Sequence, residues 1–354
     1  MTNKISIIIT AYNRKEFLLD AVRSVLQNDY PRELYEIVVC KNFKDPFIDS
    51  FLSHNDVFVI DSGNVNIGEQ LFLAISNSSC DIICFLDDDD RFKVNKLKSI
   101  FFKFSEDKEI VYYHNQTDSI DEKSNPLPGN IHKRISNKVI LRGPSVEPIA
   151  EYLRTRDDFT LYSLMFNLSC VSVRRSVISP YIQYLRKIID GTDWFVFYCA
   201  LLSSGKLYFD TEILTDYRVH RSGSNIFTTN ASLLEIAKFS ISKFNTDGHF
   251  LSILLEMCHG TDVETILRAK MLEEKILMRI QGQKSHVTIR EYSDYLKLLR
   301  YVVHPSVKTK LIRFIFILSS LLFPSITGIF YNLYRKHNLK SNLYSYDGAT
   351  KDSA

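Results

Sequence analysis

The chain has 354 residues, of which 45% are hydrophobic and 24% charged, and its formal net charge is +3. This composition is typical of a globular protein with room for a catalytic domain and an appendage. So small a positive excess does not favour a nucleic-acid binder, and we expect no nucleic acid among the partners. The six cysteines form no CxxC pair, which predicts buried, reduced thiols rather than disulfides or a zinc site.

Residues 1–115 alternate strand and helix patterns. β-Branched and apolar runs predict strands, apolar residues at helical spacing predict helices, and together they indicate a mostly parallel sheet with helices on its faces. In such sheets ligands bind at the carboxyl ends of the strands. The expected strands cover residues 5–10, 35–40, 57–60 and 81–86, and the expected helices cover 17–26, 67–77 and a stretch starting near 93.

The rest of the chain divides by composition. Residues 116–165 are rich in proline and glycine and predict loops, followed by a strand over 167–173, a helix over 192–202 and a short strand over 206–209. Residues 229–305 have a helical pattern with few turn signals, and we expect a helical extension there. Residues 306–338 are expected to associate with a membrane, and the polar tail 339–354 is expected to be disordered.

Four consecutive aspartates, Asp87–Asp90, directly follow an apolar strand pattern. Like charges this close repel one another, so the cluster favours a bound cation. Oxygen ligands suit Mg²⁺ or Mn²⁺, which take one or two carboxylates together with substrate phosphates. The alternative is a solvated loop whose last aspartate caps the next helix.

Three stretches resemble family 2 glycosyltransferases: Ser6–Arg14 (SIIITAYNR), Glu36–Val39 (EIVV) and Asp81–Asp90 (DIICFLDDDD). The resemblance covers about residues 4–225. It implies a GT-A fold, with a nucleotide-sugar-binding part in 1–115 merged with an acceptor-binding part in 116–228. It also implies an inverting transfer from a nucleoside-diphosphate sugar to a glycan or lipid-linked acceptor.

The resemblance assigns roles to individual residues. Asp87 would lie near the ribose and Asp89 would bind Mn²⁺ or Mg²⁺, with Asp87 as a further ligand and with Asp88 and Asp90 able to share these roles. The end of the first strand would hold the nucleotide, through Thr10, Ala11, Tyr12 and Arg14. For Tyr12 taken alone, a partly buried aromatic residue is the alternative.

The sequence departs from the family after the second strand. The family usually carries an acidic pair there that recognises the base, whereas this chain reads Cys40–Asp45 (CKNFKD). We expect Asn42 to contact the base edge and Lys41 to meet phosphate, and the identity of the base stays open. A second departure is Gly68-Glu69, where the family often has an Arg-Asn pair.

A one-step inverting transfer needs a carboxylate that takes the acceptor's proton. The resemblance places it in Asp190–Trp194 (DGTDW), and we predict Asp193, which a helix N-terminus would keep ionised. The alternatives are Asp190 as the base, or Asp193 as an ordinary first-turn charge. Trp194 would stack on an acceptor sugar or lie in the core. Tyr217–His220 (YRVH) resembles a family stretch in which His220 would approach the metal or diphosphate.

Residues 314–334 carry no charged side chain and are bracketed by Lys308, Lys310, Arg313, Arg335 and Lys336. We predict that residues 308–336 lie in the plane of a membrane interface, with the basic flanks favouring anionic lipids. A single span and a helix inside the protein core are the alternatives. Since the N-terminus reads as a strand rather than a secretion signal, we expect a cytoplasmic, peripherally membrane-associated protein.

Two other functions fit the same motifs. A metal-dependent nucleotidyltransferase would use the aspartates but release pyrophosphate and not need Asp193. A degenerate, non-catalytic member would bind sugars or act as a scaffold, a reading that the altered segment after Cys40 keeps open.

Overall fold

The computed structural model describes residues 4–128, 134–155, 164–220, 248–280, 286–301, 307–323 and 326–333. The chain forms two compact units: residues 1–145 with 162–219, and residues 146–161 with 220–354. Each unit is described below by itself.

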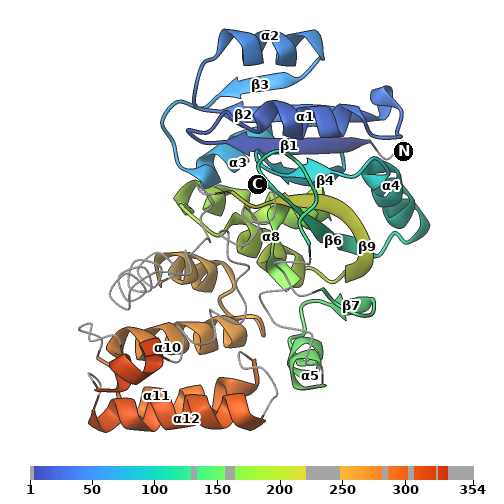
Figure 1. Ribbon diagram of the computed structural model, residues 1–354. Coiled ribbons are helices and arrows are strands. Elements are labelled where there is room, and N and C mark those ends of the chain that lie inside the picture. Colours follow the sequence, from blue (N-terminus) through green and yellow to red (C-terminus); the bar gives the residue numbers. More distant parts are fainter. Residues whose placement is uncertain are drawn as a thin grey trace. The chain divides into compact units, whose positions relative to one another are not determined.

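The first unit is built on a mixed sheet (Figure 1). Its strands run in the order β3-β2-β1-β4-β8-β6-β9-β5, and β7 pairs with β9. The strands are β1 Ile5–Ala11, β2 Tyr35–Lys41, β3 Phe58–Asp61, β4 Ile82–Asp87, β5 Arg91–Phe92, β6 Ile110–Ile120, β7 Val139–Arg142, β8 Val171–Arg174 and β9 Lys206–Arg218.

The half of the sheet formed by β3, β2, β1 and β4 is parallel, as the sequence predicts. Every residue of β1 is buried, which explains its continuous isoleucine run: a strand covered on both faces has no solvent side. The register places Thr10 of β1 beside Asp87 of β4, and Ala11 beside Lys41 of β2. The carboxyl ends of three neighbouring strands therefore meet at one edge.

Helices cover both faces of this sheet. Helices α1, α2 and α4 pack with Ile5, Ile7 and Ile9 of β1 in one apolar cluster. Helix α8 lies on the opposite face, where Tyr112 of β6 meets Phe197 with ring centroids 6.0 Å apart. The helices of this unit are α1 Leu18–Leu26, α2 Pro46–His54, α3 Ile67–Ser76, α4 Lys96–Glu106, α7 Arg175–Ile178 and α8 Thr192–Leu201, with 3₁₀ turns η1 Arg32–Leu34, η2 Leu168–Cys170 and η3 Ser179–Lys187.

Several predicted boundaries were wrong. The segment 116–165, predicted as loops, contains the end of β6, all of β7 and the helix α5, Glu147–Thr155. The strand predicted over 206–209 continues to Arg218, and α2 was not predicted. The polar residues of β6, among them Asn115 and Thr117, are buried and paired inside the sheet, so the strand lacks the apolar pattern that marks β1. The prediction of reduced cysteines is confirmed, since all six are free and buried.

The second unit is helical in its described part, as expected for the extension. Its elements include α5, α10 Glu264–Ile280, α11 Ile289–Leu298, η4 Leu299–Tyr301 and α12 Val307–Leu322, together with the helical residues 248–257 and 326–333. Helix α11 begins with a capping box between Thr288 and Glu291. The Tyr292 hydroxyl meets Ser320 Oγ at 3.1 Å and ties α11 to α12. None of the helices in the described residues has the length and apolar character needed to span a membrane. The predicted disordered tail lies outside the described residues.

Candidate active site

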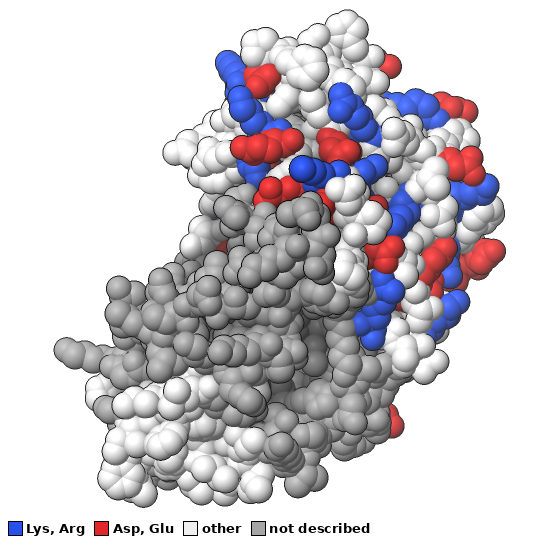
Figure 2. Space-filling model, viewed as in Figure 1, with Lys and Arg blue, Asp and Glu red and all other residues white. Residues whose placement is uncertain are grey.

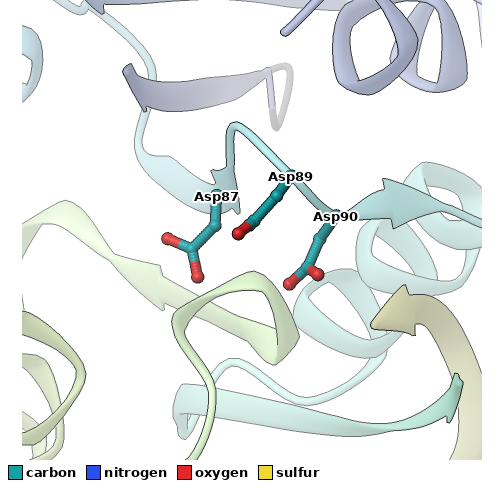
Figure 3. Close-up of side chains that lie close together, drawn as sticks. All are labelled: Asp87, Asp89 and Asp90. Atoms are coloured by element: carbon teal, nitrogen blue, oxygen red, sulfur yellow. The ribbon is translucent and has the colours of Figure 1, made fainter. Parts of the chain in front are cut away.

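The aspartate cluster sits at the carboxyl end of β4. Asp87 is the last residue of the strand, and Asp88–Asp90 form the turn that leads into β5. The carboxylates of Asp87, Asp89 and Asp90 point toward one another, with ligand oxygens within 4.8 Å (Figure 3). Asp88 lies outside this group and is buried. The cluster therefore contains Asp87 and Asp89, which the resemblance predicts as metal ligands, and also Asp90.

The charges of this cluster are destabilised in the absence of a cation. Burial raises the pKa of Asp87 well above its usual value, and the neighbouring charges of Asp90, Asp89 and Asp88 add to the effect. Burial, followed by the charge of Asp89, raises the pKa of Asp90 to about 7. Three convergent carboxylates, of which Asp87 and Asp90 resist ionisation, fit a hard divalent ion such as Mg²⁺ or Mn²⁺, which would compensate their charge.

Two other segments hold the turn in place. The Asp87 backbone N–H donates to Ser169 Oγ at 2.9 Å. Asp90 accepts from Asn167 Nδ2 at 2.6 Å and from the backbone N–H of Arg218 at 2.9 Å. No sequence pattern predicted Ser169 and Asn167 as residues of the site, because they come from η2 and the residue that precedes it, far from the aspartates along the chain.

Arg14 is directed at the aspartates. Its guanidinium group is hydrogen-bonded to Asp88 and forms an ion pair with Asp89 at 2.8 Å. Burial lowers the pKa of Arg14, but the bond and charge of Asp88 and the charges of Asp89 and Asp87 outweigh it, so the net shift is upward. Arg14, predicted to bind the donor, thus lies at the same site.

The other predicted donor residues line the same edge of the sheet. Tyr12 is 41% exposed and its hydroxyl donates to Asn64 Oδ1 at 3.1 Å. Asn42 Oδ1 accepts from the Asn13 backbone N–H at 2.7 Å, and its amide donates back to Asn13 Oδ1 at 2.9 Å. The structure therefore brings Thr10, Ala11, Tyr12, Asn42 and Asp87 together at the ends of β1, β2 and β4.

Lys41, expected at phosphate, is instead an internal residue. Its side chain is 4% exposed and forms an ion pair with Asp49 at 2.8 Å. Its Nζ also donates to the Phe43 carbonyl at 2.5 Å and lies 5.0 Å from the centre of that ring. Lys41 therefore fastens the segment after β2 to α2.

Asp193 stands in the first turn of α8, after Gly191, whose positive φ of 81° starts the helix. Beyond burial and its aspartate neighbours, the charge of Asp193 also raises the pKa of Asp87, so these two carboxylates interact. The Trp194 backbone N–H donates to Asp193 Oδ1 at 2.9 Å. Asp190 accepts from the Gly191 N–H at 2.8 Å and holds the turn before the helix. His220, predicted as a metal ligand, belongs to the second unit, where it begins the segment 220–354.

Comparison with known proteins agrees with this geometry. The model of the family described as Glycosyl transferase family 2 matches residues 6–179. Residues 6–179 therefore form a glycosyl transferase family 2 domain. The chain is 26% identical over 241 residues to an uncharacterized glycosyltransferase of Rickettsia typhi, covering 66% of this chain and 69% of the relative. A second uncharacterized glycosyltransferase, from Rickettsia prowazekii, is 26% identical over 245 residues, with coverages of 66% and 69%.

Solved structures of S. aureus TarS have a similar fold. TarS 1-349 in complex with UDP superposes with a TM-score of 0.54 at 12% identity, covering 96% of this chain and 92% of that one. A further TarS structure gives a TM-score of 0.51 at 11% identity, covering 92% of this chain and 54% of TarS. The predicted GT-A fold and the predicted enzyme class, a glycosyltransferase, are confirmed.

In this glycosyltransferase the Arg218 side chain is buried and makes its contacts inside the protein. Its side chain is 1% exposed and ion-paired with Asp20, and the guanidinium carbon lies 4.7 Å from the centre of the Phe17 ring. Nη1 donates to the carbonyls of Asp121 and Glu122. These contacts show that the Arg218 side chain is directed into the protein.

Proposed function

We propose that this protein is an inverting glycosyltransferase that moves a sugar from a nucleoside-diphosphate sugar to a glycan or lipid-linked acceptor. The influence of the Asp193 charge on Asp87 supports the proposal, because it indicates that the candidate base lies within electrostatic range of the cluster suited to a metal. TarS, which shares the fold, has been solved with UDP. That complex supports a nucleotide-bearing donor for this protein.

Asp87, Asp89 and Asp90 are the residues that would hold Mn²⁺ or Mg²⁺. A divalent ion there would neutralise negative charge on the leaving diphosphate. Arg14 would add a fixed positive charge from the side of β1, held in place by the buried Asp88. Asp88 thus acts on the donor through Arg14.

The base would be recognised at the ends of β1 and β2. Tyr12 offers an exposed ring for stacking, and the Asn42 amide, fixed by its reciprocal bonds with Asn13, offers polar atoms in place of the family's acidic pair. Thr10 and Ala11 are buried and directly precede Tyr12, and Thr10 lies opposite Asp87 in the sheet.

Asp193 would accept the proton of the acceptor hydroxyl as that oxygen attacks the anomeric carbon and the nucleoside diphosphate departs. Its place in the first turn of α8 favours the ionised form that a base requires. Trp194, half-buried next to it, would provide a face for the acceptor sugar.

A thermal-shift screen of nucleoside diphosphates and nucleotide-sugars, with and without Mn²⁺, tests the donor site. We expect one nucleotide series to raise Tm only with metal, and Asp89→Ala to abolish the shift. An absence of any metal-dependent shift would favour the non-catalytic, sugar-binding alternative. Pyrophosphate release that does not depend on Asp193 would instead favour a nucleotidyltransferase.

We also propose that the segment 308–336 binds a membrane surface in its plane. Along α12, exposed apolar side chains recur at helical spacing, at Leu311, Phe314, Ile315, Leu318 and Leu322. The helix over 326–333 continues the row with Ile326, Ile329, Phe330 and Leu333, each at least 46% exposed. Their exposure disfavours a helix buried in the protein core. On the face of the first unit seen in Figure 2, by contrast, acidic and basic side chains are interspersed.

A further inference from the structure

Lys96 is an unusual residue for the start of a helix that follows a ligand-binding turn. It is the first residue of α4 and is fully buried, with 0% of its surface exposed. Lysine is almost never fully buried unless its charge is compensated. Here the Nζ atom lies among strands and turns of the site: it donates to Asn115 Oδ1 at 3.0 Å, the Ser169 carbonyl at 2.6 Å and Thr215 Oγ1 at 2.9 Å.

The hydrogen-bond pattern defines the charge on this lysine. The Asn115 oxygen and the Ser169 carbonyl can only accept. Thr215 Oγ1 donates its own proton to the Ser169 carbonyl at 3.1 Å and accepts from Asn115 Nδ2 at 2.9 Å, so it too accepts from Lys96. Three acceptors require three N–H groups, which only the charged ammonium form has. Burial lowers the pKa of Lys96, but the Phe92 ring, 4.2 Å from Nζ, and these oxygens favour the cation.

Ser169 connects this cation to the aspartates. Its carbonyl accepts from Lys96, while its hydroxyl accepts the backbone N–H of Asp87 at 2.9 Å and is hydrogen-bonded to Asp90. Asn167, two residues earlier, donates to Asp90. The charge of Asp90 in turn acts on Lys96. One ammonium group therefore fixes the segment that orients two of the three clustered carboxylates.

We propose that Lys96 is the internal positioning residue of the metal site, fixing Ser169 against the aspartate turn and supplying a permanent positive charge near Asp90. The proposal rests on the proposed function, since it assumes that Asp87, Asp89 and Asp90 bind a divalent ion. Stability alone does not explain a lysine here, because taking a charge out of water is costly and an apolar side chain of similar volume often serves as well. A residue that orients metal ligands from behind typically changes metal affinity about 10- to 100-fold when it is replaced.

The test is Mn²⁺ binding to the full-length protein by isothermal titration calorimetry, with Tm and circular dichroism as measures of folding. Lys96→Met keeps the length of the side chain and removes the charge, and we expect it to weaken Mn²⁺ binding about 10- to 100-fold. Lys103→Met is the matched control: it lies on the same helix and removes an ion pair with the buried Asp210, 2.8 Å away. It should lower Tm and leave the Mn²⁺ affinity unchanged.

Ser169→Ala keeps the proposal testable if Lys96→Met does not fold. It removes only the Ser169 hydroxyl, which is hydrogen-bonded to Asp87 and Asp90, and keeps the Ser169 carbonyl that Lys96 contacts. The change should weaken Mn²⁺ binding in a folded protein. Wild-type affinity in a folded Lys96→Met protein, or in Ser169→Ala, would overturn the inference while leaving the metal site intact. An absence of Mn²⁺ binding in the wild type, with no difference from Asp89→Ala, would instead overturn the metal site in the proposed function.

Discussion

Arg218 Nε donates to the backbone carbonyl of Asp89 at 2.7 Å, and the Arg218 backbone N–H donates to the Asp90 carboxylate. A single residue at the end of β9 therefore holds two consecutive residues of the aspartate turn. Its remaining donors reach Asp20 and the segment that follows β6. Arg218 and strand β4 therefore both hold the carboxylates in their convergent arrangement.

Replacing Arg218 should damage both stability and the site. Arg218→Met removes a donor from the Asp20 carboxylate and from three backbone carbonyls, and leaving a buried acceptor unsatisfied costs about 1–3 kcal/mol. We expect a clear fall in the free energy of unfolding by urea, and weaker Mn²⁺ binding in the protein that remains folded. Arg174→Met is the control, because Arg174 also donates to two carbonyls, those of Ile110 and Phe104, and its guanidinium carbon lies 5.2 Å from the centre of the Phe104 ring. It should lose stability and keep its Mn²⁺ affinity.

Asp193→Asn tests the chemical step. The amide preserves the shape of the side chain but cannot take a proton, so kcat for acceptor-dependent sugar transfer should fall about 10²- to 10⁴-fold. Donor binding, measured as the metal-dependent rise in Tm, should be retained, because the change leaves the strand ends that hold the nucleotide untouched. Asp190→Asn is the matched control and should keep most of the activity. Full turnover by Asp193→Asn, or loss confined to Asp190→Asn, would contradict the assignment of the base.

The apolar row on α12 gives a prediction about membranes. Leu318 and Leu322 are 45% and 74% exposed, and burying such side chains contributes about 1.5–3 kcal/mol each. Changing both to serine should lower co-sedimentation with anionic liposomes by at least about tenfold. The control is Ile289→Ser, which removes another exposed apolar side chain, 82% exposed at the start of α11. Equal binding by the double variant and the wild type would contradict the in-plane helix.

The parts of the fold and of the site that could be predicted from the sequence are those marked by a local sequence pattern. The isoleucine run of β1 and the aspartates after β4 are local patterns, and both lie where the sequence predicts. Strand β6 was not predicted, because His114 and Asn115 look like loop residues until their partners are known. Lys96 and Ser169 carry no local signal either, since a lysine near a helix start normally faces solvent. Their roles arise from contacts between segments distant in the chain.

His114 gives the last prediction, and it concerns stability against pH. This histidine is 3% exposed, its Nε2 lies 2.7 Å from the Phe166 carbonyl, and burial lowers its pKa to about 4. In the unfolded chain the group titrates near 6.5, so between pH 6.5 and 4 the unfolded state takes up a proton that the folded state does not. The contribution of His114 to the free energy of unfolding is therefore fully present above pH 6.5, and up to about 3 kcal/mol is lost as the pH falls through 4.

Urea unfolding at pH 7.0, 5.5 and 4.5 measures this contribution as a difference between wild type and His114→Gln, in which other titrating groups cancel. Glutamine can still donate to the Phe166 carbonyl but does not ionise. The variant should be less stable than the wild type at pH 7.0, because it fills the site less well, and the gap should narrow as the pH falls. A gap for His114→Gln that stays constant with pH would mean that His114 takes up its proton over the same pH range in the folded and the unfolded protein, in conflict with its buried place between Tyr112 and Phe209.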